Sequence, residues 1–256
     1  MDLTLQPLPA FQDNYIWLLA TGSVAAVVDP GDAAPVLNAL AERHLRLAAV
    51  LVTHHHADHM GGAAELAREH ACPVYGPAKE AIESVDRPLM EGAEVDIPTI
   101  QARFRVLDIP GHTAGHIAYG GHGIIFCGDT LFSAGCGRLF EGTAQQMCAS
   151  LAKLAALPDD TWVCCGHEYT LANLKFAREV EPDNRDVREY AQECTARRAR
   201  DEPTLPSRLG LERRVNPFLR CAEPAVRDAA RRRLGREPAG PVEVFAVIRA
   251  WKDVFS

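Results

Sequence analysis

Seven consecutive residues, Thr53 to His59, contain four histidines and one aspartate. They follow the apolar run Leu47 to Val52, which is typical of a buried strand. Alternate side chains of an extended segment point the same way, so His54 and His56 can bind one metal ion. We expect His55 to lie at the surface or beside a ligand. The alternative is a solvated polar loop that is merely rich in histidine, but clustered histidines at this spacing usually bind metal.

Asp58 and His59 follow where the chain turns toward an expected helix over residues 60–70, so they point in a different direction. The loop therefore offers two pairs of ligands aimed at two places. A helix predicted over residues 33–44 precedes the strand, which places these ligands at the carboxyl edge of a sheet.

Three later predicted strands end in the same way. Each is a short apolar run followed closely by a glycine, and the next side chain can bind metal: His112, Asp129 and His167. Glycine permits the tight backbone geometry of such a turn. Asp129 in a Gly-Asp-Thr turn would by itself be an ordinary turn residue, but the recurrence of the pattern favours a ligand.

The candidate ligands are too many for one tetrahedral ion. They suit two ions that share a bridging carboxylate and keep open positions for water. We expect Asp129 to be the bridge, because it is the only carboxylate in the three later loops and has two oxygens to share. The full set is His54, His56, Asp58, His59, His112, Asp129 and His167.

Composition restricts the class of protein that carries this site. The chain has 256 residues, 47% of them hydrophobic, which suits one large domain or a large domain with a smaller one. No apolar run is long enough to span a membrane, and the first residues lack the features of a signal peptide, so we expect a cytoplasmic protein. The eight scattered cysteines then predict reduced, mostly buried thiols.

Charge is distributed unevenly along the chain. Residues 1–168 hold 9 Lys and Arg against 20 Asp and Glu, whereas residues 169–256 hold 18 against 14. A basic C-terminal part suggests either a nucleic-acid partner or an anionic small substrate, and the pI of 5.8 disfavours nucleic acid. Arg-rich segments with helical spacing and Pro or Gly breaks predict a helical second domain over 169–256, after a first domain over 1–168.

The Thr53 to His59 run, with its downstream Gly-His-Thr, Gly-Asp-Thr and Gly-His-Glu turns, resembles the metallo-β-lactamase superfamily. Within it, the chain resembles the glyoxalase II (hydroxyacylglutathione hydrolase) family along nearly its whole length. The narrower resemblance is carried by Phe11 to Tyr15, Gly135 to Thr143, Cys165 to Thr170 and Asn216 to Arg220. It implies an α/β fold, a four-layered αββα sandwich with a two-metal site at one edge, and a small C-terminal all-helical domain.

The resemblance also implies a reaction, the hydrolysis of S-(2-hydroxyacyl)glutathione, typically S-D-lactoylglutathione, to a 2-hydroxy acid and glutathione. This is the second step of methylglyoxal detoxification. A hydroxide between the two metals attacks the thioester carbonyl, with Asp58 and Asp129 as the catalytic carboxylates. Zinc fits the imidazole and carboxylate ligands, as do iron and manganese. The implied ligand sets are His54, His56 and His112 for one ion, Asp58, His59 and His167 for the other, and Asp129 as the bridge.

Glutathione recognition is implied at five positions. Arg249 and Lys252 match the family's R-x-x-K pair, which grips the glycine carboxylate, and residues three apart on a helix share a face. Arg138 and Phe140 stand where many members have Lys and Tyr, so one hydrogen bond to the substrate is lost at Phe140. Tyr169 keeps the third family position. The expected partner is a small glutathione thioester bound by a monomer, with no nucleic acid and no membrane.

Other functions compete with this one. A persulfide dioxygenase of the same superfamily would use one iron and oxygen, but it normally lacks the helical domain with R-x-x-K. A broader thioesterase is compatible with Arg138 and Phe140. A tRNA-processing endonuclease would need a long basic arm, and a non-enzymatic metal module would more often use Cys ligands and leave no open position.

Overall fold

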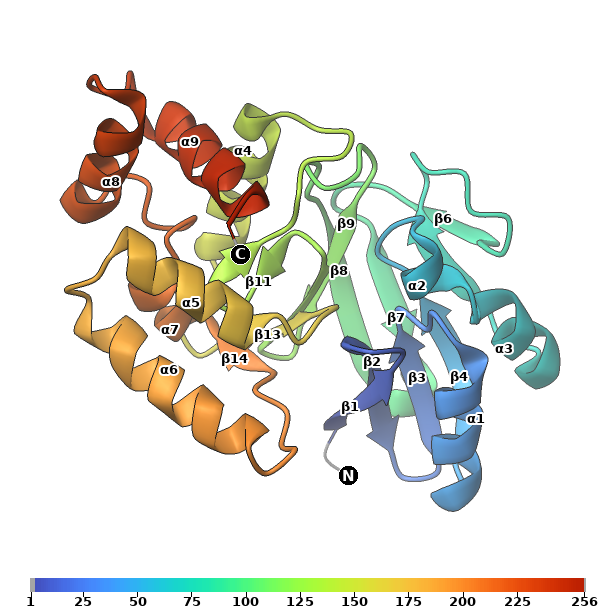
Figure 1. Cartoon of the computed structure of the whole chain (residues 1–256). Helices are drawn as coiled ribbons and strands as arrows, with labels where there is room; N and C mark the ends of the chain where they lie inside the picture. Colours follow the sequence, from blue (N-terminus) through green and yellow to red (C-terminus); the bar gives the residue numbers. More distant parts are fainter. Residues whose placement is uncertain (1–2, 256) are drawn as a thin grey trace. The chain divides into compact units, whose positions relative to one another are not determined.

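The computed structural model describes residues 3–255, and Figure 1 shows the arrangement of their helices and strands. The chain divides into two compact units. The first unit comprises the chain through Asp108, Thr113–Gly128 and Cys164–His167, and the second comprises Ile109–His112, Asp129–Val163 and the chain from Glu168 onward. Within residues 3–255 no helix is long and apolar enough to cross a membrane.

The first unit is built mainly of strands. Two six-stranded sheets run in the orders β1-β2-β3-β4-β5-β6 and β14-β13-β10-β9-β8-β7. The first sheet contains β1 (Thr4–Ala10), β2 (Asn14–Thr21), β3 (Val24–Val28), β4 (Arg46–Leu51), β5 (Val74–Pro77) and β6 (Arg87–Leu89). The other contains β7 (Glu94–Ile97), β8 (Ala102–Asp108), β9 (Ile117–Gly121), β10 (Ile124–Gly128), β13 (Trp162–Cys165) and β14 (Ser207–Arg208), of which β14 and the first two residues of β13 are assigned to the second unit.

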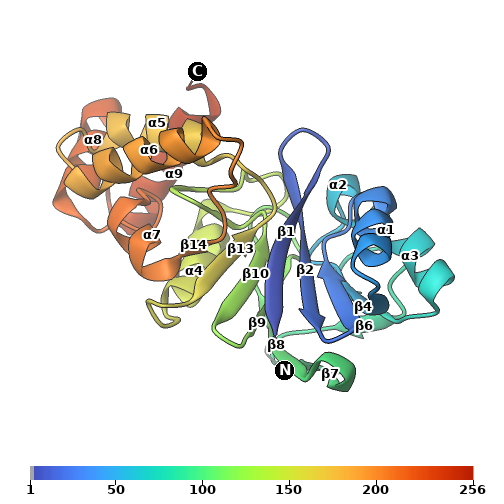
Figure 2. The ribbon, with the colours of Figure 1, turned by 90° about the horizontal axis from the view of Figure 1, so that it is seen from below.

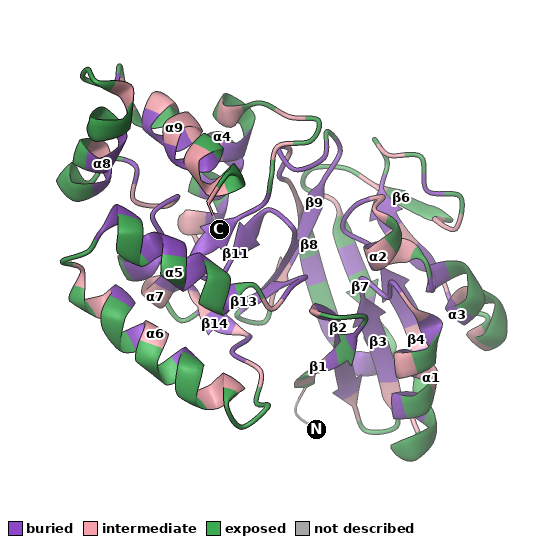
Figure 3. Cartoon of the chain, in the orientation of Figure 1, coloured by how far each residue is buried: buried purple, intermediate pink, exposed green. Residues whose placement is uncertain are grey.

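Helices cover one face of the first sheet. The predicted helix over 33–44 is present as α1 (Ala33–Glu42), and α3 (Ala63–His70) lies beside it (Figure 2). Asp32 begins α1 by accepting a hydrogen bond from the Ala34 amide. Val36 and Leu66 project from these helices into a core shared with the strands, which are largely buried in Figure 3.

The two sheets of the first unit also pack on each other. Trp17 of β2 contacts Phe126 of β10 with ring centroids 6.5 Å apart, and Phe126 contacts Phe104 of β8 at 5.8 Å. The Tyr119 hydroxyl of β9 donates to the Val52 carbonyl at 2.8 Å. This buried layer fixes the ends of β4 and β10, and both ends lead into candidate ligands.

The helix expected over residues 60–70 is present as α3, but it begins three residues later than predicted. The structure has α2 (Ala57–Met60), then Gly61 and Gly62, then α3. A Cβ on Gly62 would lie 2.4 Å from the Ala33 backbone nitrogen, so the chain passes too close to α1 for any larger residue. The glycine pair divides the helix and leaves a separate short turn that carries Asp58 and His59.

The second unit is mainly helical. It holds a small hairpin of β11 (Leu131–Phe132) and β12 (Gly135–Cys136). Its helices are α4 (Ala144–Ala155), α5 (Thr170–Val180), α6 (Arg185–Arg198), α7 (Leu209–Val215), α8 (Pro224–Leu234) and α9 (Pro241–Asp253), with a single turn η1 (Pro98–Ile100) in the first unit. Exposed residues face outward on α6 and α8 (Figure 3).

A buried carboxylate supports the β11–β12 hairpin. Glu212 of α7 accepts hydrogen bonds from the Ser133 hydroxyl at 2.9 Å and the Ala134 amide at 2.7 Å. Asn216 donates to the Phe132 and Gly135 carbonyls at 3.1 and 2.9 Å. These bonds hold the segment that directly follows Asp129.

All eight cysteines are free thiols, and every one except Cys148 is buried. Burial raises the pKa of Cys136 and of Cys148 to about 11.

Candidate metal centre

The histidine loop begins directly after β4 and ends in α2. His54 is buried, and His56, which precedes the first residue of α2 in an extended conformation, is partly exposed. The His54 Nε2 and His56 Nδ1 atoms lie 3.1 Å apart. The structure therefore brings two ring nitrogen atoms of this loop to one point, and His55 points elsewhere, toward Glu80.

A second group forms where α2 meets the end of β13. The Nε2 atoms of His59 and His167 lie 3.3 Å apart. The Asp58 Oδ2 atom lies 3.6 Å from His59 Nε2 and 3.4 Å from His167 Nε2. A Cβ on Gly31 would lie 1.9 Å from the Asp58 carbonyl oxygen, so only glycine allows α2 to pack here.

Carboxylates on the far side of two rings fix their tautomers. Asp29 Oδ2 lies 3.1 Å from His59 Nδ1, and Asp13 Oδ1 lies 2.8 Å from His167 Nδ1. An ionised carboxylate only accepts hydrogen bonds, so each Nδ1 must carry the hydrogen. In the neutral rings both Nε2 atoms then present lone pairs.

This donor set fits a divalent cation. Two lone pairs facing each other at 3.3 Å, with a carboxylate oxygen beside them, repel unless positive charge lies between them. Neutral imidazoles held by carboxylates through Nδ1 are the usual arrangement of histidine ligands. The chain therefore has the chemistry of a metal-binding site at Asp58, His59 and His167.

Asp58 is held in its ionised form. When His167 is protonated and no cation is bound, its hydrogen bond to Asp58, helped by His59 and Asn14 and opposed by burial, keeps the pKa of Asp58 well below its usual range. Asn14 Nδ2 donates to Asp58 Oδ2 at 2.9 Å. A carboxylate with so low a pKa is a ready ligand over the whole neutral range and a weak base.

His112 and Asp129 lie in the second unit. His112 Nδ1 donates to the Arg138 carbonyl at 2.9 Å, which leaves Nε2 for a ligand bond. That Nε2 atom lies 3.5 Å from Asp129 Oδ2. A Cβ on Gly137 would lie 1.9 Å from the Asp129 carbonyl oxygen, so this close packing also requires glycine.

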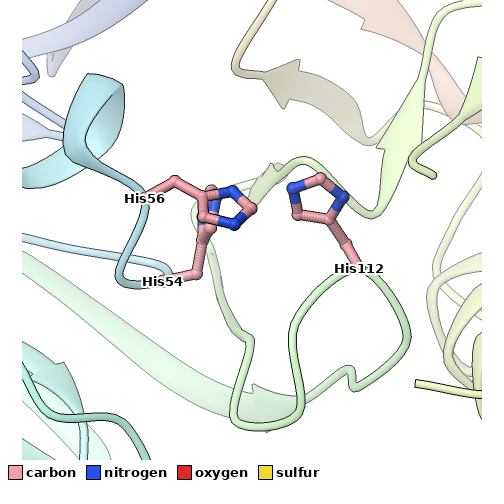
Figure 4. Close-up of side chains that lie close together, drawn as sticks. All are labelled: His54, His56 and His112. Atoms are coloured by element: carbon pink, nitrogen blue, oxygen red, sulfur yellow. The ribbon is translucent and has the colours of Figure 1, made fainter. Parts of the chain in front are cut away.

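Two sets of ligand atoms converge among the described residues. His54, His56 and His112 each offer a ring nitrogen within 4.8 Å of the others (Figure 4). Asp58, His59 and His167 form a second set within the same limit. Asp29, His54 and His59 form a third grouping, because Asp29 lies against the Nδ1 atom of His59. Asp129 is in none of these sets, and its Oδ2 atom lies 3.5 Å from His112 Nε2.

Three of the expected glutathione-binding residues are exposed. Phe140 is 63% exposed, and its ring contacts the His112 ring edge-on at 5.2 Å. Tyr169 is 36% exposed and its ring contacts Phe132 at 5.2 Å. Arg138 is also exposed, with its Nε 3.6 Å from Asp253 Oδ1.

Arg249 and Lys252 differ from each other although they share one face of α9. Arg249 is 5% exposed; its guanidinium donates to the Cys136 carbonyl at 2.7 Å and lies 3.1 Å from Asp253 Oδ1. Lys252 is partly exposed and donates to the Ala172 carbonyl at 3.1 Å. Burial, with a smaller contribution from nearby Arg249, Arg138 and Lys175, lowers the pKa of Lys252 to about 8.

Residues 11–167 match the metallo-beta-lactamase superfamily model, and residues 168–255 match that of the hydroxyacylglutathione hydrolase C-terminus. The hydroxyacylglutathione hydrolase of Nitrosomonas eutropha is 53% identical over 97% of this chain and 98% of its own length. That of Alkalilimnicola ehrlichii is 56% identical over 96% of this chain and 97% of its own. The chain belongs to the hydroxyacylglutathione hydrolase family. The family predicted from the sequence motifs is thus confirmed.

Solved structures confirm the metallo-β-lactamase fold for this family member. ETHE1 from Myxococcus xanthus has a TM-score of 0.66 and 25% identity, covering 98% of both chains. A protein solved in a di-iron-bound form has a TM-score of 0.59 and 28% identity, covering 84% of this chain and 100% of its own. The BLEG-1 B3 metallo-beta-lactamase, 24% identical, has a TM-score of 0.63, covering 84% of this chain and 99% of its own.

Sequence reasoning missed the supporting residues Asp13 and Asn14. Both lie in the stretch Phe11 to Tyr15, which carried the family resemblance but gave no role for either residue. Asp13 is 154 residues away from the histidine that it contacts, so no local pattern could pair them. The structure also places Asp29, which directly follows β3, against His59.

We expect Asp29→Asn to weaken metal binding. Asp29 Oδ1 accepts from the Thr53 amide at 2.7 Å, and Oδ2 accepts from the Thr53 hydroxyl at 2.8 Å and from His59. An amide places an NH₂ group against one of these donors and removes the charge that holds the His59 tautomer. Loss of such support typically costs about 10- to 100-fold in metal affinity.

Metal titration of the stripped protein, with zinc in competition with a chelator, measures this effect. Asp32→Asn is the matched control, because asparagine caps α1 as well as aspartate does. If Asp29→Asn bound metal as tightly as the parent and Asp32→Asn, Asp29 would be only a turn residue.

Proposed function

We propose that this chain is a thioesterase that hydrolyses S-(2-hydroxyacyl)glutathione, with S-D-lactoylglutathione as its typical substrate, to the hydroxy acid and glutathione. The observation that carries the chemistry is the convergence of imidazole nitrogen atoms whose other ring nitrogen is already bonded to the protein. Near full-length relatives named hydroxyacylglutathione hydrolase support the substrate.

We further propose two ions per chain, most readily zinc, with iron and manganese compatible with the same ligands. His54, His56 and His112 would hold one ion, and Asp58, His59 and His167 the other. Asp129, near His112, would bridge them. The relative solved in a di-iron-bound form supports a site for two ions in this fold.

Divalent cations, when bound, lower the pKa of water and stabilise negative charge that develops on the thioester carbonyl oxygen. The protein keeps its ligands in the protonation states that bind a cation. Asp29 and Asp13 hold His59 and His167 as neutral donors, and the low pKa of Asp58 keeps that side chain ionised. The leaving group is a thiolate, which departs without a strong general acid.

Residues 169–256, together with Arg138 and Phe140, would recognise glutathione, while residues 1–168 carry all seven proposed metal ligands. Arg138, Arg249 and Lys252 place three positive charges near one another: after burial, the two arginines are among the causes that lower the pKa of Lys252. Such a cluster attracts the glycine carboxylate. Phe140 and Tyr169 offer exposed rings for the peptide portion. We expect a monomer that works in the cytoplasm.

Parallel kinetics on two thioesters test this assignment. S-D-lactoylglutathione should be hydrolysed with a kcat/KM about 10- to 150-fold higher than S-D-lactoyl-N-acetylcysteamine, which lacks both glutathione carboxylates. Removal of metal should abolish both activities, and zinc should restore them. Equal rates on the two esters would indicate a broader thioesterase, and oxygen uptake with glutathione persulfide would indicate a dioxygenase.

The pKa of Lys252 predicts a pH dependence of substrate binding. Below pH 8 the side chain carries the charge that attracts a carboxylate, and above pH 8 it becomes neutral. KM for S-D-lactoylglutathione should therefore be flat at lower pH and rise as pH passes through about 8, while kcat is unaffected by this group. Initial rates between pH 6 and 9.5, corrected for spontaneous thioester hydrolysis, measure it.

The control is Lys252→Met, which keeps the length of the side chain without the charge. Its KM should start higher and lack the rise near pH 8. A rise of the same size in Lys252→Met would assign the titration to another group.

A further inference from the structure

Glu80 is a buried carboxylate of the first unit that takes no part in the reaction proposed above. Its side chain is 3% exposed. It lies in the turn after β5, where the Ile82 amide donates to the Glu80 carbonyl at 3.1 Å. The Ile82 side chain belongs to the core beneath α1 and α3. Glu80 is therefore fixed to the rigid part of the unit.

Three hydrogen-bond donors from two different loops converge on this carboxylate. Oε2 accepts from His55 Nδ1 at 2.9 Å, within the histidine loop. Oε1 accepts from the Gly115 amide at 3.1 Å and from the Thr113 hydroxyl, both in the loop that follows β8. A Cβ on Gly115 would lie 2.5 Å from the Glu80 Cγ, so the approach of Glu80 requires glycine there.

The donors are neighbours of the candidate ligands. His55 lies between His54 and His56, and Thr113 directly follows His112. A buried carboxylate that loses a donor costs about 1–3 kcal/mol or more, so all three bonds resist separation. One side chain thereby couples the positions of two loops, which are also joined by the hydrogen bond from the Ile117 amide to the Thr53 carbonyl at 3.0 Å.

We propose that Glu80 is a positioning residue of the metal centre. It holds the His54–His56 segment and the residues after His112 at the spacing that the three histidines need to share one ion. This inference rests on the proposed metal-dependent function, and it assigns to His55 the role of linking its two neighbours to Glu80.

Two substitutions separate geometry from charge. Glu80→Gln keeps the length: its carbonyl oxygen can accept from Thr113 and Gly115, and its NH₂ can donate to His55 Nδ1 in the other tautomer. Glu80→Asp keeps the charge but is one methylene too short to reach both loops. Glu83→Gln is the matched control, since Glu83 is exposed three residues further along the same segment.

The readouts are zinc affinity of the stripped protein, the absorption spectrum of the cobalt-substituted protein, and the separate kcat and KM. For Glu80→Asp we expect the affinity of one of the two ions to fall about 10- to 100-fold, with an altered cobalt spectrum and lower kcat at unchanged KM. Glu80→Gln should stay within about threefold of the parent, and Glu83→Gln should match it.

Equal losses in Glu80→Gln and Glu80→Asp would show that charge matters and overturn the proposal, as would parental metal affinity in Glu80→Asp. Thermal melting of the metal-free proteins shows whether each variant folds, and Glu80→Gln, the milder change, still decides between geometry and charge if Glu80→Asp does not. A parent that bound no metal would instead refute the proposed function.

Discussion

Asp129→Ala should lower kcat/KM by about 10³-fold or more and release at least one ion, a greater loss than truncation of any single histidine. A bridging carboxylate serves both ions and offsets their mutual repulsion, which amounts to several kcal/mol of stabilisation. Asp129 is only 6% exposed and lies 3.5 Å from His112 Nε2. It follows Gly128, whose φ of +46° sets the turn at the end of β10.

Metal content and steady-state kinetics, measured on the same purified sample, test this expectation. His112→Ala provides the comparison with a ligand of one ion, and Asp129→Asn tests whether one neutral oxygen suffices. Circular dichroism establishes that each variant is folded. An Asp129→Ala protein with both ions and near-normal turnover would remove the bridge from the mechanism.

The second large effect concerns Arg249 and Lys252 of α9, whose replacement we expect to have different consequences. Arg249→Ala removes a buried guanidinium that donates to the Cys136 carbonyl and pairs with Asp253. It should cost about 1–3 kcal/mol of unfolding free energy, because the buried Cys136 carbonyl loses its donor, while Asp253 is exposed to solvent. Lys252→Ala should leave stability nearly unchanged and raise KM, with a loss of about 1.5–3 kcal/mol in transition-state binding.

Chemical denaturation measures the first effect, and kinetics on the two thioesters measure the second. Lys252→Ala should lose its penalty on the ester that lacks the glycine carboxylate, and the penalty on S-D-lactoylglutathione should shrink with added salt. An increase in KM of equal size on both esters would mean that Lys252 does not bind the glycine carboxylate. An Arg249→Ala protein as stable as the parent would contradict the anchoring role that its contacts indicate.

The chemistry of the candidate site was accessible from sequence because each ligand follows a strand. An apolar run, a glycine and a histidine or aspartate are adjacent in the chain, so His112, Asp129 and His167 could be recognised one at a time. The family and fold then followed from motifs. Local pattern also gave α1 and β4 close to their true limits.

Other features depend on contacts that spacing does not encode. The break at Gly61 and Gly62 arises from the approach of α1, which lies some thirty residues earlier in the chain. Spacing placed Arg249 and Lys252 on one helical face but could not show that one is buried on a backbone carbonyl and the other is not. Glu80 gave no signal, because its three partners lie 25 to 35 residues away.

The burial of the cysteines bears on how such an enzyme tolerates the oxidised form of its product. A protein thiolate attacks glutathione disulfide, which forms a mixed disulfide and releases one glutathione. With a pKa of about 11, Cys136 and Cys148 are ionised at pH 7 in only about one molecule in 10⁴. These two sulfurs are therefore almost inert toward glutathione disulfide, and the β11–β12 hairpin that carries Cys136 is spared a bulky tripeptide adduct.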